Sequence, residues 1–251
     1  NEKRKTQDTI KGVYAIVKSD LESDVKTIDW LLTKEKKSDS IFKRVINKEM
    51  TYNDYLNCDY CASILGGFLI ENYNVLSQYI SESYAIDTEY GKILRIFGYI
   101  PSGILITLFC FLGVKYFQPS TLIKIGFYGI GIFYGLATLV VGIFPCDSGC
   151  NMALIDPSFS QLIHNFTGLL TYLFVPFLMI LIGLGLKKST YYSFSVQSIL
   201  LGIVSFLLVC VLSSDLTSEY IGLYQRMIEL IFVLWIIFCA NEIKSKNGYT
   251  L

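Results

Sequence analysis

The chain has 251 residues, of which 53% are hydrophobic and only 17% are charged, and its formal net charge is zero. A mean hydropathy of +0.49 is too high for an average soluble domain and predicts that most of the chain has lipid as its solvent. The basic residues are spread over short loops between apolar runs, which argues against a nucleic-acid partner.

Residues 1–54 are more polar than the rest and predict a helical hairpin. Apolar side chains recur at helical spacing over residues 10–32, and a second apolar face follows over residues 41–50. We expect this cytoplasmic hairpin to serve packing or oligomerisation, with a homo-oligomer formed through its helices. The alternative is a basic surface helix that lies on anionic lipid.

From about residue 55 onward, the apolar runs are long enough to cross a hydrocarbon core of about 30 Å, which takes about 20 helical residues. Five runs are clear, and they cover residues 93–117, 122–144, 162–186, 194–212 and 220–240. A sixth run at residues 51–70 is weaker, because Asn57 and Asp59 interrupt it. The sequence therefore predicts an all-α transmembrane bundle over residues 55–241.

Lysines predict the orientation of this bundle, because short cytoplasmic loops carry an excess of Lys and Arg. The loops after residues 93–117 and 162–186 and the tail at residues 242–251 contain lysines, whereas the opposite loops are acidic. The segment before residue 51 is also basic. Both termini are then cytoplasmic and the number of crossings is even. We expect a six-span protein of the plasma or inner cell membrane, with a short or tilted first span.

Ionisable side chains inside the last run are the strongest candidates for a functional site, because charge is unfavourable in lipid. Arg226 and Glu229 are three residues apart and share one helical face with the neighbouring Gln225. At about 1.5 Å per residue, Arg226 lies roughly 9 Å and Glu229 roughly 13 Å below Tyr220. Either the two charges neutralise each other, or this face lines a polar pocket in the outer half of the bundle.

Other polar residues fall at the outer ends of the remaining runs, and they favour a pocket. They are Arg95, Asp147, His164 and Asn165. His164 is the only histidine, which excludes a bis-histidine haem and a multi-histidine metal site, so we expect no metal and no cofactor. His164 is either a hydrogen-bonded residue at a helix start or one member of an acid–base pair that Asp147 orients.

Two pairs of cysteines have spacings that suggest disulfide chemistry. Cys146 and Cys150 lie in an outer loop, where an oxidising compartment would permit a structural disulfide. Cys58 and Cys61 have the CxxC spacing of redox thiols, but they are predicted near the opposite membrane face. A disulfide relay between the two pairs is therefore disfavoured, and their redox states stay open.

Several short motifs occur in a recognisable order, namely the segment 73–82 (YNVLSQYISE), Phe144-Pro145-Cys146-Asp147, His164 and Gln225-Arg226. Together they resemble a prokaryotic multi-pass membrane family known as domain of unknown function 998. The likeness covers about residues 58–240 and leaves out the N-terminal 54 residues. It implies a six-span bundle in which Glu82, Asp147, His164 and Arg226 match motif positions, and it implies no assigned activity.

Three functions follow from these observations. The first is the binding or transport of a small polar or lipid-headgroup ligand in an outer-leaflet pocket, with membrane lipids and a small molecule as partners. The ligand-binding residues would be Arg226, Glu229, Arg95, Glu82 and Gln225. The second is a membrane-embedded hydrolase, in which His164 and Asp147 act on Ser81 or Ser148 as nucleophile. The third is a scaffold whose N-terminal hairpin binds a partner. Buried charge favours the first.

Overall fold

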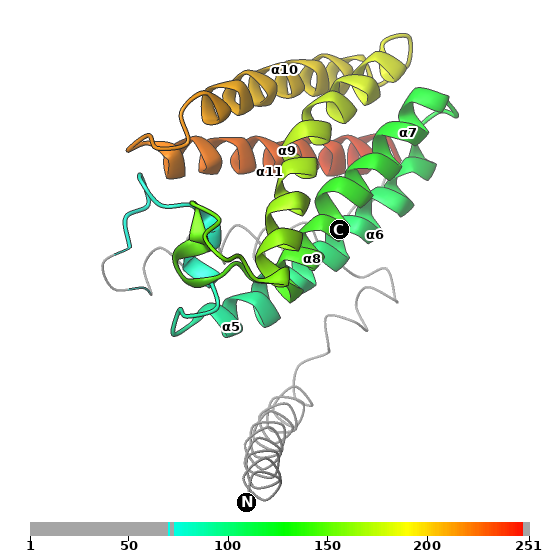
Figure 1. The fold of residues 1–251 in the computed structure, drawn as a ribbon. Coiled ribbons are helices and arrows are strands. Elements are labelled where there is room, and N and C mark those ends of the chain that lie inside the picture. The colour runs from blue at the N-terminus through cyan, green and yellow to red at the C-terminus, as the bar shows by residue number, and fades with distance from the viewer. Residues whose placement is uncertain (1–69, 71–72, 248–251) are drawn as a thin grey trace, which may run out of the picture. The chain divides into compact units, whose positions relative to one another are not determined.

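The structure, a computed structural model, describes residue 70 and residues 73–247 of the chain (Figure 1). Over this part every regular element is a helix and no strand occurs, so the predicted all-α fold is confirmed there. The predicted hairpin at residues 1–54 lies outside the described residues, and so does the predicted first span except for Ile70. The six-span count and the cytoplasmic position of the N-terminus stay predictions.

Five helical segments of the described chain are long and apolar enough to cross a membrane, and they correspond to the five clear apolar runs. The first consists of α5 (Gly91–Leu94), the π-helix η2 (Arg95–Tyr99), α6 (Ile100–Gly113) and the 3-10 turn η3 (Val114–Tyr116). The second consists of α7 (Thr121–Ile130), the π-helix η4 (Gly131–Leu136) and α8 (Ala137–Ile143). The remaining three are α9 (Phe159–Leu186), α10 (Tyr192–Ser214) and α11 (Ile221–Asn247).

α9 and α11 extend beyond the predicted runs by three or more residues at one end, because apolar character and helix formation end at different residues. α9 begins at Phe159, since the Ser158 hydroxyl accepts the Gln161 N–H and caps the helix. α11 continues through Asn247, into the predicted tail. Charged residues such as Lys244 and Lys246 end a lipid-facing run, but they are good helix formers and suit a helix C-terminus.

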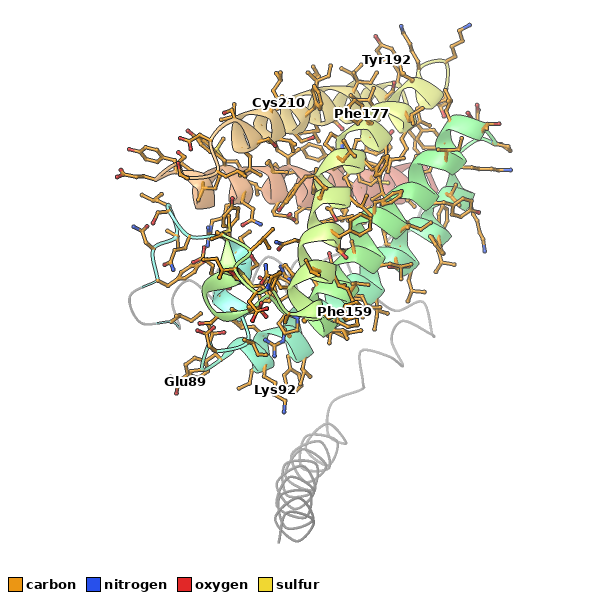
Figure 2. All side chains as sticks on the ribbon, in the orientation of Figure 1. Glu89, Lys92, Phe159, Phe177, Tyr192 and Cys210 are labelled. Carbon is orange, nitrogen blue, oxygen red and sulfur yellow. A yellow bond between two sulfur atoms is a disulfide. The ribbon has the colours of Figure 1, made fainter. Side chains whose placement is uncertain are left out.

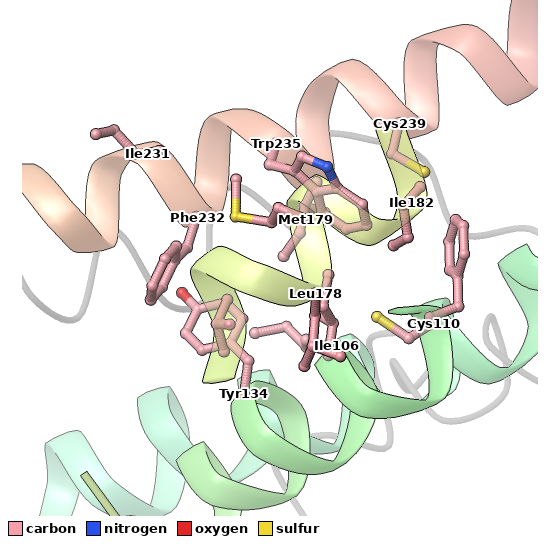
Figure 3. Packing of buried hydrophobic residues seen from close by; sticks show 14 of the residues in the cluster. Ile106, Cys110, Tyr134, Leu178, Met179, Ile182, Ile231, Phe232, Trp235 and Cys239 are labelled. Atoms are coloured by element: carbon pink, nitrogen blue, oxygen red, sulfur yellow. The ribbon is translucent and has the colours of Figure 1, made fainter. Parts of the chain in front are cut away.

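The core lies where α9 packs against α7 and α10, and where α10 packs against α11. Figure 3 shows Trp235 of α11 beside Met179 and Ile182 of α9. The buried Trp235 donates its indole N–H to the Ser198 hydroxyl at 2.6 Å, and Ser198 donates to the Met179 carbonyl at 2.9 Å. Three helices are thus tied together by polar groups that lipid could not satisfy.

The outer surface of the bundle is apolar, as expected for a protein surrounded by lipid. Leu200, Leu207 and Val211 form an exposed stripe along α10, and the first two are more than half exposed. Phe177 and Cys210 also lie on the outside of the helices (Figure 2). A continuous apolar surface of this kind is unusual on a water-soluble monomer.

Three connecting segments meet at one end of the bundle, where α9 and α11 begin and α8 ends. They are residues 73–90, 144–158 and 215–220, and they contain the 3-10 helices η1 (Ile80–Tyr84) and η5 (Ser148–Asn151). In Figure 2, Glu89 and Lys92 mark this end, and Tyr192 marks the opposite one. The lysine distribution predicts that this end faces the outside.

Candidate functional site

A cavity of about 350 Å³ lies at this end of the bundle. Its wall is made by side chains of η2, η4, α8, α9 and α11, together with residues 75–84. Both π-helices contribute a tyrosine, Tyr99 from η2 and Tyr134 from η4. Local π-helical turns insert a residue into an α-helix and are frequent at functional sites, because they redirect side chains that regular helix would point elsewhere.

Arg226 attaches residues 73–84, which we call the covering segment, to α11. Its Nη1 donates to the carbonyls of Val75 at 2.8 Å and Gln78 at 2.9 Å, and its Nη2 donates to the hydroxyl of Tyr73. The guanidinium also lies 5.5 Å from the centre of the Tyr73 ring, within cation–π range. Arg226 therefore clamps the covering segment while it lines the cavity.

The close approach of the covering segment to α11 depends on a glycine. A Cβ added at Gly222 would lie 2.2 Å from the Gln78 carbonyl oxygen and 2.9 Å from Nη1 of Arg226. With no side chain at this position, the N–H of Leu223 reaches the carbonyl of Leu76 at 3.0 Å. Main chain thus pairs with main chain at the start of the helix, where N–H groups lack intrahelical partners.

A hydrogen-bonded chain leads from the covering segment to Glu229. The Ile80 N–H donates to Oε1 of Gln225 at 2.7 Å, and Nε2 of Gln225 donates to the Tyr172 hydroxyl at 3.0 Å. Tyr172 donates in turn to Oε1 of Glu229 at 2.8 Å, and the Tyr134 hydroxyl donates to Oε2 at 3.1 Å. All but Ile80 are contributed by spans, so this network links three spans and the covering segment around the cavity.

His164 is buried and presents one ring nitrogen to the cavity. Its side chain is 8% exposed, and Nδ1 lies 3.0 Å from the carbonyl oxygen of Phe144. A carbonyl only accepts, so Nδ1 carries a proton, and in the neutral imidazole Nε2 is then an acceptor. Nε2 has no protein partner in the described chain, where every inaccessible side-chain nitrogen or oxygen has one. Nε2 is therefore accessible from the cavity that His164 lines.

Asp147 lies outside the cavity wall and holds the start of α9 instead. Its Oδ2 accepts the Ser158 N–H at 2.9 Å, and its own N–H donates to Oε1 of Gln161 at 2.7 Å. Hydrogen bonds from the Ser158 side chain and backbone lower the pKa of Asp147. No hydrogen bond in the described chain joins Asp147 to His164, so the two side chains do not form the acid–base pair that was one of the two alternatives for His164. Nδ1 of His164 instead bonds to the Phe144 carbonyl.

The two candidate nucleophiles are separated as well. Ser81 belongs to the cavity wall, whereas Ser148 is exposed and donates its hydroxyl to Asp87. A hydrolytic site would need nucleophile, base and orienting carboxylate in contact. The described chain brings only Ser81 and His164 to the same cavity.

Arg95 and Glu82 lie outside the cavity wall and support the covering segment. Nη1 of Arg95 donates to the carbonyl of Tyr84 at 2.6 Å. The Glu82 carboxylate accepts the N–H of Tyr79 at 2.7 Å and the side-chain amide of Gln78 at 3.0 Å. Of the five predicted ligand-binding residues, Arg226, Glu229 and Gln225 line the cavity. Arg95 and Glu82 instead hold the covering segment in position.

A disulfide joins Cys146 and Cys150 in the segment between α8 and α9. Gln161, which is completely buried, donates its side-chain amide to the Cys150 carbonyl at 3.1 Å. The Cys146 carbonyl accepts the N–H of Ile86 at 3.1 Å. The disulfide segment is therefore tied both to α9 and to the chain that follows the covering segment. Among the described residues, no group of three or more His, Cys, Asp or Glu side chains is arranged to hold a metal.

A family described as protein of unknown function (DUF998) matches residues 59–241 of the chain. The chain belongs to the DUF998 family. The resemblance drawn from the short motifs is therefore confirmed. The match contains the entire cavity wall, from Val75 to Val233, and leaves residues 1–58 outside. Comparisons with curated proteins and with solved structures find no match.

The sequence analysis did not predict several residues that shape this DUF998 cavity. Tyr134 and Tyr172 hold the Glu229 carboxylate, and Gln161 connects the disulfide segment to α9. A signal for the tyrosines was present, because both lie near the middle of apolar runs and tyrosine usually lies at the membrane interface. A hydroxyl at that depth needs a polar partner, and Glu229 was the available one.

Proposed function

We propose that this DUF998 protein is a multi-pass membrane protein that binds a small polar or lipid-headgroup ligand, for recognition or transport, in the cavity beneath the covering segment. The observation that carries the proposal is the cavity itself, at about 350 Å³. Ligand sites are concave, mainly apolar, and contain a few convergent polar groups, with volumes of roughly 300–1,000 Å³. Here the polar groups are His164, Glu229 and Gln225 among tyrosine and aliphatic side chains.

The position of the cavity supports a ligand that enters from one leaflet. The wall uses the first half of α11, from Gln225 to Val233, and the first half of α9, from His164 to Tyr172. The predicted orientation places this half of the bundle in the outer leaflet. A lipid headgroup or a small solute from the outside would reach these residues without crossing the membrane.

Gly168 provides a way to fill the cavity without disturbing the wall. It lines the cavity, and a Cβ added there would have no heavy atom within 4 Å. We expect Gly168→Leu to leave α9 intact, since leucine is a better helix former than glycine by roughly 0.5–1 kcal/mol. The new side chain would occupy the space that a ligand needs.

The experiment compares the lipids and small molecules that copurify with the full chain, identified by mass spectrometry after extraction. Phe166→Leu serves as the control, because Phe166 is on the same helix, is 62% exposed and does not line the cavity. We expect a molecule that copurifies in stoichiometric amount with the wild type and with Phe166→Leu, and that is lost from Gly168→Leu. Equal recovery from all three proteins would show that the cavity is not its site.

A further inference from the structure

We infer that the ligand of this cavity carries an ammonium group, either in a lipid headgroup or in a free amine. The inference rests on the proposed function and specifies the chemistry of that same site. It is drawn from the direction of the hydrogen bonds in the wall and from the aromatic rings around it.

Four hydroxyl groups in the wall donate their protons to the protein. Thr138 donates to the Tyr134 carbonyl at 2.8 Å, and Thr171 donates to the Thr167 carbonyl at 3.1 Å. The hydroxyls of Tyr134 and Tyr172 both donate to Glu229. A hydroxyl has one proton, so what these groups still offer a ligand is oxygen lone pairs.

His164 and Glu229 also present acceptors to the cavity. In the neutral imidazole of His164, Nε2 is an acceptor, because Nδ1 carries the single ring proton toward Phe144. The Glu229 carboxylate accepts from Tyr134 and Tyr172, and a carboxylate has only acceptor oxygens. Such a wall matches a group with several N–H donors or a positive charge, and it mismatches a phosphate or carboxylate, which only accepts.

Four tyrosines line the same cavity as these acceptors. Tyr84 and Tyr99 line the cavity with their ring centres 4.1 Å apart, and the rings of Tyr134 and Tyr172 also form part of the wall. The negative face of an aromatic ring attracts organic cations, and aromatic cages are a common way to bind quaternary ammonium groups. A carboxylate beside several tyrosines therefore favours an ammonium ligand.

Among the described residues, Arg226 is the only cation in the cavity wall, and its position does not reverse this preference. Its Nη1 faces the carbonyls of Val75, Gln78 and Gly222, and its Nη2 donates to Tyr73. The guanidinium is therefore oriented by the covering segment at the edge of the cavity. In a phospholipid ligand, the phosphate that follows the ammonium along the headgroup would lie on that side.

The first test uses the wild-type full chain in nanodiscs of phosphatidylglycerol, which has no ammonium group. Native mass spectrometry measures the binding of added phosphatidylethanolamine and of N-acetyl phosphatidylethanolamine, which has the same acyl chains and a neutral amide. A thermal-shift assay compares choline with 3,3-dimethylbutan-1-ol, its neutral isostere. We expect the charged member of one pair to bind about tenfold more tightly, in line with a desolvated cation–π and charge contact.

The two pairs distinguish the source of the ammonium. Preference for phosphatidylethanolamine over its acetylated form assigns a lipid headgroup, and preference for choline over its isostere assigns a free amine. Glu229→Gln should reduce the preference at least several-fold, whereas the control Glu219→Gln, an exposed carboxylate at the same end of the bundle, should not. Because both ligand comparisons are made on the wild type, the test holds even if Glu229→Gln does not fold.

The outcome separates this inference from the proposed function. If Gly168→Leu abolishes the binding of a ligand and both neutral probes bind as well as the charged ones, the cavity is a binding site and the ammonium inference is wrong. If no probe or copurified molecule responds to Gly168→Leu, the proposed function itself fails, and this inference fails with it.

Discussion

A methyl group added at Gly222 tests whether the covering segment lies on α11 as described. The new Cβ would be 2.2 Å from the carbonyl oxygen of Gln78 and 2.8 Å from that of Val75. Both atoms belong to the main chain, so only movement of the covering segment away from the helix can relieve the contact. That movement would break the hydrogen bond between the Leu223 N–H and the Leu76 carbonyl.

The expected loss follows from the hydrogen bonds that depend on this contact. The bond of Leu223 and the two that Arg226 donates to Val75 and Gln78 contribute, at about 1 kcal/mol each, about 3 kcal/mol. Alanine favours the helix over glycine by up to about 1 kcal/mol, which offsets part of this loss. We therefore expect Gly222→Ala to weaken the attachment of the covering segment by about 2 kcal/mol.

Hydrogen–deuterium exchange of the full chain in nanodiscs measures this attachment at peptides from the covering segment and the start of α11. A loss of about 2 kcal/mol corresponds to exchange about 30-fold faster. Gly168→Ala is the matched control, because its added Cβ has no neighbour within 4 Å and should slow exchange or leave it unchanged. Equal exchange in Gly222→Ala and the wild type would refute the described contact.

Two further predictions concern the core and the disulfide segment. Ser198→Ala removes the acceptor of the buried Trp235 N–H, so we expect the free energy of unfolding to fall by about 1–3 kcal/mol. Denaturant titration measures this loss, and it should be smaller for Ser198→Thr, which keeps a hydroxyl. The pKa of Asp147 is lower in the folded protein than in an unfolded chain. Ionised Asp147 therefore stabilises the fold at pH values above the usual aspartate pKa, and this stabilisation is lost as the pH falls through the folded-state pKa. Asp147→Asn should therefore melt below the wild type at neutral pH, with a difference that shrinks in acid; a pH-independent difference would contradict this.

The five apolar runs were predicted correctly because lipid imposes a local requirement on sequence. Each crossing needs about 20 apolar residues in succession, and such a run can be read without knowledge of its neighbours. The ends of the helices were predicted less well. Ser158 starts α9 ahead of the run through its cap, and Lys244 continues α11 after it, because capping and helix propensity follow different residues from hydropathy.

The candidate site was predictable only in part. Arg226 and Glu229 stood out because ionisable groups inside a span are rare, and Gln225 was found as their neighbour. Asp147 and His164 are both polar and both lie near the predicted outer end of the bundle. Proximity along the membrane normal does not decide which of these groups form a hydrogen bond with each other. His164 bonds to the Phe144 carbonyl and Asp147 to the Ser158 N–H, and both partners are main-chain groups without a sequence signature.

By itself, the sequence determined that the chain contains an all-α bundle of membrane-spanning length and that charge is concentrated in the first half of the last span. Both properties depend on each residue's own transfer from water to lipid. The tertiary structure decided that Arg226 clamps a segment about 150 residues earlier in the chain, with Val75 and Gln78 as its acceptors. It also decided that Tyr134 and Tyr172 enclose Glu229. Such contacts depend on how the spans pack, and no local pattern encodes which hydroxyl or carbonyl will face a given charge.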